Sequence, residues 1–388
     1  LMRDAFEKKL VQMLERPTQG VSDFLAVIDG LRFIAITAVI LYHMNDYLVT
    51  KMGRQIESDW LSDLLSKGYI GVPLFFALSG FIISRPFLAG NAPRIGAYFA
   101  RRLTRLEPPY LINLVLIYTL LVLVLGMNAA ELFPNLLASA LYIHHFVFDG
   151  VSKINFVAWS LEVELQFYLL APLLLAALVL AGSLPRRLVL VALVLLGGWI
   201  YHAPEVRESF FGLTLLRFVG FFAAGMLAAD IFVHHWRQRP QPGLKGDGLA
   251  LTGIMLVGLG LAGVPWAHGL MPAWVLLILL GSLSGRCWTR LLSLQPVYLI
   301  GGMCYTLYLY HFYVISAVGR IVLPWLPESQ PLWLNLLLMM LFVLPVVLLV
   351  GALLFVAVER PFMAWHPGRQ ALMSRVTADA PGEPVAKR

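Results

Sequence analysis

Long apolar stretches dominate this chain, and short polar segments separate them. A helix that crosses a membrane needs about 20 mainly apolar residues, and the chain contains about ten stretches of that kind. They cover residues 27–49, 69–89, 109–126, 157–183, 187–203, 210–233, 248–264, 268–285, 298–322 and 333–358. The pattern predicts an all-α protein, a polytopic bundle of about ten transmembrane helices.

Residues 129–148 form one further apolar stretch, which Glu131 and Pro134 interrupt. If this stretch were a span, every later loop would change sides, and Arg186 and Arg187 would lie outside. Cytoplasmic loops normally carry the excess of lysine and arginine. We therefore expect 127–156 to be an outer-face segment, either a loop or re-entrant.

Composition and charge agree with a membrane protein. The chain is 59% hydrophobic and 13% charged, and its mean hydropathy is +0.78, which excludes an ordinary water-soluble domain. With the N-terminus inside, most basic residues fall in cytoplasmic segments, and the outer segments hold only Lys51, Arg54, Lys67, Lys153 and Arg207. The net charge of +7 therefore reflects the basic residues of the cytoplasmic segments and does not indicate a nucleic-acid partner. Both termini are expected in the cytoplasm.

The chain divides into three parts. Residues 1–23 are polar with apolar positions at helical spacing, which predicts an amphipathic segment at the membrane surface, in contact with lipid. Residues 24–363 form one membrane domain. Residues 364–388 are rich in proline, glycine and polar residues, and we expect a disordered cytoplasmic tail.

Two ionisable residues share one face of the first span. Arg32 and His43 are eleven residues apart, which is three turns plus about 20° and a rise of about 16 Å. Arginine suits phosphate, and histidine suits proton transfer near neutral pH. The alternative is that Arg32 pairs with Asp29 and that His43 only hydrogen-bonds a neighbouring helix.

Two carboxylates enter the fourth span one residue apart, Glu162 and Glu164. They lie about 200° apart around the helix axis and cannot face the same cavity, so we expect one to turn inward and the other to reach the interface. The alternative places both in the headgroup zone.

A run of arginines, Arg101, Arg102 and Arg105, follows the second span. It suits a phosphorylated donor or serves only as a cytoplasmic anchor. Soluble catalytic motifs are absent, and the pairs His144-His145 and His234-His235 lack a third ligand, so no metal is expected.

The ordered motifs resemble the acyltransferase-3 family of membrane enzymes, over most of residues 27–363. Six segments carry the resemblance: Ile28–Ala35 with Tyr42-His43, Gly71–Phe81, Arg101–Arg105 with Pro108-Pro109-Tyr110, Trp159–Tyr168, Tyr305–His311, and Glu359–Phe362. Two positions depart from it. Pro73 stands where many members have an acidic residue, and Glu107 adds a negative charge that would temper donor binding.

The resemblance implies a multi-pass O-acyltransferase of the bacterial inner membrane. Its donor would be cytoplasmic acyl-CoA, most often acetyl-CoA, and its acceptor a hydroxyl of a periplasmic or cell-surface glycan or glycolipid. Arg32 and the arginine run would hold the donor phosphates. His43 would act as general base or accept the acyl group itself, and Glu164 would fix the histidine tautomer or the acceptor. Supporting or substrate-binding roles fall to Asp29, Trp159, Ser160, Glu162, Tyr168 and His311.

A transporter or flippase for a glycan, lipid or small anion is the main alternative. Such proteins show inverted repeats and helices broken at matching places in two halves. The sequence shows no clear repeat, although Gly71, Pro73 and Gly80 lie in the second span. Hydrolysis or exchange of acetyl-CoA in detergent, where transport is impossible, would distinguish the two functions.

Overall fold

The computed structural model describes residues 8–9, 11–17, 26–52, 59–238, 240–327 and 329–364. All regular elements in these residues are helical, apart from one isolated bridge between Gly243 and Gly285. The all-α prediction is therefore confirmed. The predicted tail after Ala364 and most of the predicted N-terminal segment lie outside the described residues.

Nine helical segments of the described chain are long and apolar enough to cross a membrane. Their main helices are α2 (Ala26–Met52), α4 (Gly71–Leu88), α5 (Ile95–Leu123), α8 (Trp159–Leu180), α9 (Ser183–His202), α11 (Leu215–Asp230), α12 (Leu244–Leu261), α17 (Cys304–Val322) and α18 (Leu332–Leu354). Short helices extend or connect them: α3 (Trp60–Leu65), η2 (Gly68–Ile70), α6 (Ala129–Ala140), α7 (His144–Phe148), η3 (Phe156–Ala158), α10 (Pro204–Arg207), η4 (Phe210–Leu213), η5 (Ile231–His235), α13 (Pro265–His268), α14 (Met271–Ser284), α15 (Arg286–Leu292), α16 (Gln295–Gly302), η6 (Leu323–Trp325), η7 (Phe355–Glu359) and α19 (Arg360–Ala364). The chain is a multi-pass membrane protein.

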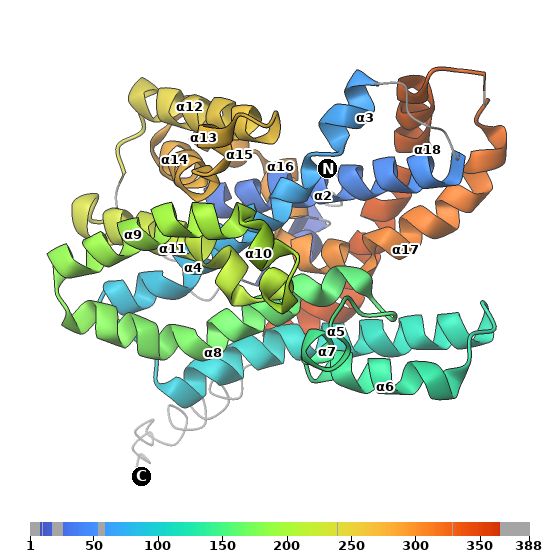
Figure 1. Cartoon of the computed structure of the whole chain (residues 1–388), viewed down its shortest axis with the longest axis horizontal. Coiled ribbons are helices and arrows are strands. Elements are labelled where there is room, and N and C mark those ends of the chain that lie inside the picture. The colour runs from blue at the N-terminus through green and yellow to red at the C-terminus, as the bar shows by residue number, and fades with distance from the viewer. Residues whose placement is uncertain are drawn as a thin grey trace, which may run out of the picture.

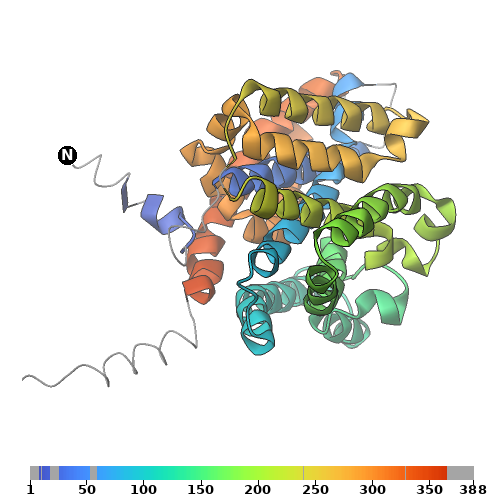
Figure 2. The same cartoon turned by 90° about the vertical axis from the view of Figure 1, so that its left-hand side faces the viewer.

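The stretch predicted as a span at 268–285 is the shorter helix α14, of 14 residues. At 1.5 Å per residue it is about 21 Å long, less than the ~30 Å hydrocarbon core. The chain turns after Ser284, because the Asp247 carboxylate accepts hydrogen bonds from the backbone N–H groups of Arg286, Cys287 and Trp288 at the start of α15. Helix α14 packs on α12 at the edge of the bundle, as Figures 1 and 2 show.

The centre of the bundle is the pair α4–α11, with α2 beside α4 (Figure 1). Two glycines allow this close approach. A side chain at Gly80 of α4 would collide with the Phe222 carbonyl group, and one at Gly225 of α11 would collide with that of Ala77. Small residues at such contacts are typical of membrane helices, whose backbones pack closely without help from the hydrophobic effect.

Residues 129–148 form two short helices and not a span, as the charge pattern predicted. Helix α6 folds back along α5 (Figure 1), because the Tyr118 hydroxyl donates to the Ala129 carbonyl oxygen at 2.9 Å and the Tyr110 hydroxyl to that of Ser139 at 3.2 Å. The segment therefore packs back along α5 and is not a further long helix.

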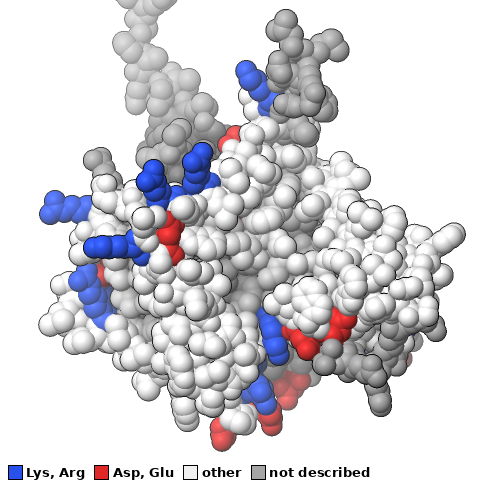
Figure 3. Space-filling view, turned by 90° about the horizontal axis from the view of Figure 1, so that it is seen from above, with Lys and Arg blue, Asp and Glu red and all other residues white. Residues whose placement is uncertain are grey.

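The outer surface is mainly apolar. In the space-filling view of Figure 3, charged side chains lie in separate groups with uncharged surface between them. Large aliphatic side chains point outward from the long helices; Leu173 is 72% exposed and Leu180 is 87% exposed. Such a surface suits contact with lipid tails.

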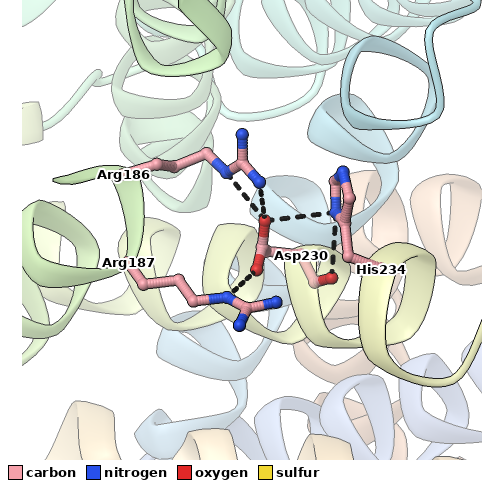
Figure 4. Close-up of polar contacts among 4 residues, drawn as sticks. All are labelled: Arg186, Arg187, Asp230 and His234. Atoms are coloured by element: carbon pink, nitrogen blue, oxygen red, sulfur yellow. Dashed lines mark hydrogen bonds and ion pairs between the residues drawn. The ribbon is translucent and has the colours of Figure 1, made fainter. Parts of the chain in front are cut away.

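A buried ion cluster joins α9 to α11 (Figure 4). Asp230 is fully buried at the end of α11, and its carboxylate contacts Arg186 at 2.6 Å, Arg187 at 2.6 Å and the ring of His234 at 3.3 Å. Arg186, counted above as a cytoplasmic charge, is itself 5% exposed. Its charge is stable there because Asp230 compensates it.

Replacing Asp230 by alanine is expected to destabilise the protein. Arg186 would remain buried without a counter-charge, at a cost of about 3–5 kcal/mol in the free energy of unfolding. Thermal melting of the detergent-purified protein measures this effect. The control is Glu208→Ala, which breaks the pair between Arg207 and Glu208, whose side chains are 52% and 68% exposed; it is expected to cost less than about 1 kcal/mol. Equal shifts in melting temperature would contradict the assignment.

Candidate functional site

A cavity of about 670 Å³ opens between the start of α2, the end of α4 and the start of α5. We call it the arginine cavity, because arginines dominate its charged lining. These are Arg16, Arg32, Arg85, Arg94, Arg101, Arg102 and Arg105. Among the described residues, Asp29 is the one acidic residue that lines it. The cavity therefore carries a large excess of positive charge and suits a ligand with several negative charges.

Asp29 holds two of these arginines. Its Oδ1 accepts hydrogen bonds from the Nη1 groups of Arg16, at 2.7 Å, and Arg32. The Asp29 side chain is 3% exposed, and those of Arg16 and Arg32 are 15% and 12% exposed. The alternative reading of Arg32, a pair with Asp29, is thus observed, yet Arg32 also lines the cavity. One carboxylate serves two guanidinium groups, which leaves net positive charge for a ligand.

The predicted arginine run lies on the cavity wall. The Arg102 guanidinium stacks over the rings of Tyr98 and Tyr168, 5.8 Å and 5.4 Å from their centroids. Deeper in the wall, the Nε groups of Arg16 and Arg105 are buried and have no hydrogen-bond partner among the described residues. Buried donors are normally paired, so these two point to an anionic ligand as the missing partner.

A narrower pocket of about 90 Å³ continues from the arginine cavity. Arg32, Arg102 and Arg105 line both. We call the narrower part the aromatic pocket, because its other lining residues include Phe75, Phe76, Tyr168, Tyr305 and Tyr308. The two spaces together form a path from the arginines into the bundle.

Glu164 lies in the wall of the aromatic pocket. Its Oε1 accepts hydrogen bonds from the hydroxyl groups of Ser79 and Tyr168, and Glu164 lines the aromatic pocket with Arg32 and Arg102. These bonds orient the carboxylate toward the arginines. Its hydrogen bonds go to Ser79 and Tyr168 and not to His43, so the sequence-based role in fixing the tautomer of His43 has no contact to support it.

At its far end the pocket reaches Tyr308 and Ser160. The Tyr308 hydroxyl donates to the Val157 carbonyl oxygen at 2.6 Å and therefore accepts from the Ser160 hydroxyl at 2.7 Å. These bonds join α17 to the start of α8. One turn further along α17, the ring of His311 lies 5.8 Å from that of Tyr308.

His43 and His311 face each other, with ring centroids 5.1 Å apart. The Nδ1 of His311 lies 2.8 Å from the Tyr308 carbonyl oxygen and 3.1 Å from that of Leu307. A carbonyl oxygen only accepts, so this nitrogen carries the proton and Nε2 keeps its lone pair. His311 Nε2 and His43 Nδ1 are both buried without a hydrogen-bond partner in the described part of the chain. Neither nitrogen is therefore occupied by another group of the described residues.

The neighbours of these histidines are aromatic. The rings of Phe156 and Phe312 lie 5.4 Å and 5.8 Å from the ring of His43. Trp159, at the start of α8, packs between Phe76, at 6.4 Å, and Phe218, at 5.4 Å. Trp159 therefore positions the first turn of α8, which carries Ser160, and does not itself line the pocket.

One sequence-based expectation was wrong in detail. Glu162 does not reach the interface; it is 4% exposed, and its carboxylate accepts the backbone N–H groups of His144 and His145 at 3.2 and 3.0 Å. It caps α7, whose first-turn N–H groups need acceptors. Glu107 lines neither the arginine cavity nor the aromatic pocket, and its effect on donor binding stays a prediction.

Arg16, Ser79 and Tyr308 belong to the site although their residue types and spacing did not predict a role for them there. Ser79 and Tyr308 lie inside recognised motifs, Gly71–Phe81 and Tyr305–His311, and hydroxyl groups in apolar spans were a usable signal. Arg16 had no comparable signal, because its place depends on contacts with residues far along the chain.

Comparison with known proteins supports the motif resemblance. The family model of the acyltransferase-3 family, an acyltransferase domain, matches residues 25–355. O-acetyltransferase OatA of Staphylococcus aureus, in strains NCTC 8325 / PS 47, COL and MRSA252, is 26% identical over 331 residues. The alignment covers 76% of this chain and 51% of OatA, so the chain spans about half the length of these relatives. No solved structure shows a significant match.

Glu162→Ala is expected to lower the stability of the fold. The substitution removes the acceptor of two buried N–H groups, and hydrogen bonds to charged groups contribute about 1.5–3 kcal/mol each. A melting temperature measured in detergent tests this. Glu131→Ala, on the exposed side of α6, is the control and is expected to change stability by about 0.5 kcal/mol or less. If both variants melted like the wild type, the capping role of Glu162 would be wrong.

Proposed function

Because the chain belongs to the acyltransferase-3 family, we propose that it is an O-acetyltransferase of the bacterial inner membrane. It transfers an acetyl group from cytoplasmic acetyl-CoA to a hydroxyl of a periplasmic or cell-surface carbohydrate. The observation that carries the proposal is the path from the arginine cavity through the aromatic pocket to Tyr308, beside His311 and His43. Relatives of the chain that are named O-acetyltransferases agree with it.

The arginine cavity suits the nucleotide end of CoA. CoA carries a diphosphate and a ribose phosphate, and arginine binds phosphate through several donors in a fixed fork. The unpaired Nε groups of Arg16 and Arg105 are available as donors. Arg32, Arg101, Arg102 and Arg105 are the sequence-predicted members of this site, and all four line the cavity.

The aromatic pocket suits the pantetheine arm and the thioester. Arg32, Arg102 and Arg105 lie at its entrance, and Phe75 and Tyr308 lie further along its wall. The arm therefore leads from the phosphates toward Tyr308 and His311. Glu164, held by Ser79 and Tyr168 at the entrance, keeps a carboxylate beside the arginines and in reach of the donor.

His43 performs the transfer, with His311 as its neighbour. In direct transfer, His43 takes the proton of the acceptor hydroxyl, whose oxygen forms the ester bond while the thioester C–S bond breaks. The proton then passes to the CoA sulfur. In the stepwise route, His43 first receives the acetyl group while the thioester C–S bond breaks and CoA leaves as the thiolate. The acceptor hydroxyl oxygen then takes the acetyl group from the ring nitrogen, and its proton passes to the CoA sulfur. Both routes need an unprotonated ring nitrogen at His43, and its buried Nδ1 has no partner that occupies it.

His43→Ala is expected to abolish transfer. Loss of a general base lowers rates by about 10²–10⁴-fold, and loss of a nucleophile lowers them at least as much. Purified protein with labelled acetyl-CoA and a glycan acceptor measures the rate. His235→Ala, which replaces an exposed histidine that lines neither the arginine cavity nor the aromatic pocket, is expected to leave the rate unchanged. Full activity of His43→Ala would remove the mechanism.

Arg102→Ala and Arg105→Ala are expected to weaken CoA binding by roughly tenfold or more, because each removes a charge-assisted contact with phosphate. Isothermal titration of the detergent-purified protein gives the Kd. Arg290→Ala, an exposed position on α15 outside both cavities, is the control. If Arg102→Ala and Arg105→Ala left the affinity for CoA unchanged, the arginine run would serve only as a cytoplasmic anchor.

The transporter alternative predicts a different result in detergent. An acyltransferase hydrolyses acetyl-CoA slowly or exchanges its acetyl group without a membrane, whereas a transporter or flippase leaves acetyl-CoA intact.

A further inference from the structure

We propose that residues 11–17, which precede the first span, are part of the donor site, with Arg16 as a phosphate-binding residue and Arg360 as the residue that positions Arg16. The proposal rests on the proposed function and adds a contact to it. Arg16 precedes the stretch that the family model matches, residues 25–355, and the family's motifs assign it no role.

Arg16 is built into the wall of the arginine cavity. Arg16 and Pro17 both line it. The aliphatic part of Arg16 lies over Gly302, where a side-chain carbon would come within 3.1 Å of Cγ and Cδ of Arg16. Gly302 thus leaves the room that Arg16 needs. At the other end of the side chain, Nη1 contacts Asp29 at 2.7 Å.

The Arg16 guanidinium has donors left for a ligand. Its Nε is buried and has no partner among the described residues. Burial lowers the pKa of Arg16 to about 10, against the opposing effect of Asp29, so the group remains charged at neutral pH. Since Asp29 also pairs with Arg32, neither arginine is fully neutralised. An anion in the cavity would supply the negative charge that both arginines still lack.

Arg360 fixes the segment that carries Arg16. Its Nη2 donates to the Gln12 carbonyl oxygen at 2.9 Å, and its Nε donates to that of Glu15 at 3.3 Å. Residues 11–14 are helical, and the carbonyl groups at a helix end lack internal partners. Arg360 supplies donors and a favourable positive charge there. Arg360 lines neither the arginine cavity nor the aromatic pocket, so any effect on the donor acts through the segment.

Arg360 is itself held rigidly from the other side. The preceding residue, Glu359, is fully buried. Its Oε2 accepts hydrogen bonds from the Thr306 hydroxyl at 2.6 Å and the Thr306 N–H at 3.2 Å. Thr306 is in the first turn of α17, the helix that carries Tyr308 and His311. The position of Arg16 is therefore tied to the helix that forms the far end of the path.

The test measures CoA binding to the full-length protein in detergent by isothermal titration. Arg16→Ala is expected to raise the Kd for CoA by roughly tenfold, and Arg16→Lys, which keeps the charge, by less. Arg360→Ala is expected to raise it as well. The double variant Arg16→Ala/Arg360→Ala should bind no more weakly than Arg16→Ala, because Arg360 acts through Arg16. Arg290→Ala is again the control.

The salt dependence of the Kd separates phosphate binding from a merely structural role. Removal of a phosphate contact makes the affinity for CoA less sensitive to ionic strength, so the slope of log Kd against log salt should become shallower in Arg16→Ala. Weaker binding with an unchanged slope would overturn the proposal, as would wild-type affinity in both Arg16 variants. If the wild type itself bound no CoA, the proposed function would fail instead.

Discussion

A guanidinium group inside an apolar helical bundle needs a counter-charge, a bound anion or other groups that accept its hydrogen bonds, and the candidate site depends on how Asp29 meets this requirement. Asp29 lies in the first turn of α2, where the helix dipole favours a negative charge. It neutralises Arg16 and Arg32 only in part, since one carboxylate contacts both. The fold thereby keeps a cationic cavity within the bundle without burying an uncompensated pair of charges.

The path that leaves this cavity changes character along its length. Charged groups surround its wide part, and aromatic rings surround its narrow part. The backbone carbonyl groups of Leu307 and Tyr308 fix the tautomer of His311, so no carboxylate is needed for that purpose. Glu164 is then free to act among the arginines. A donor with a phosphorylated end and an apolar arm matches the order of these environments.

The sequence predicted those features that depend on one helix at a time. Apolar length predicted the spans. The 200° separation of Glu162 and Glu164 agrees with the structure, in which Glu164 lines the aromatic pocket and Glu162 caps α7. Contacts between helices could not be predicted from the sequence. The role of Glu162 depends on α7, and the pairing of His43 with His311 depends on how α2 packs against α17. The end of α14 was not predicted, because it depends on a hydrogen bond to Asp247, which lies on a different helix. For Arg16, no local sequence pattern predicts a contact with a residue far along the chain.

The contact between the two ends of the chain also affects when the site can form. During synthesis the ribosome releases Gln12, Glu15 and Arg16 long before Arg360, and membrane helices are inserted in order from the N-terminus. The N-terminal segment can take its final position only after α18 and α19 have been added. A partly made or truncated chain therefore has an incomplete wall around its arginines, so the finished protein alone presents the whole cavity.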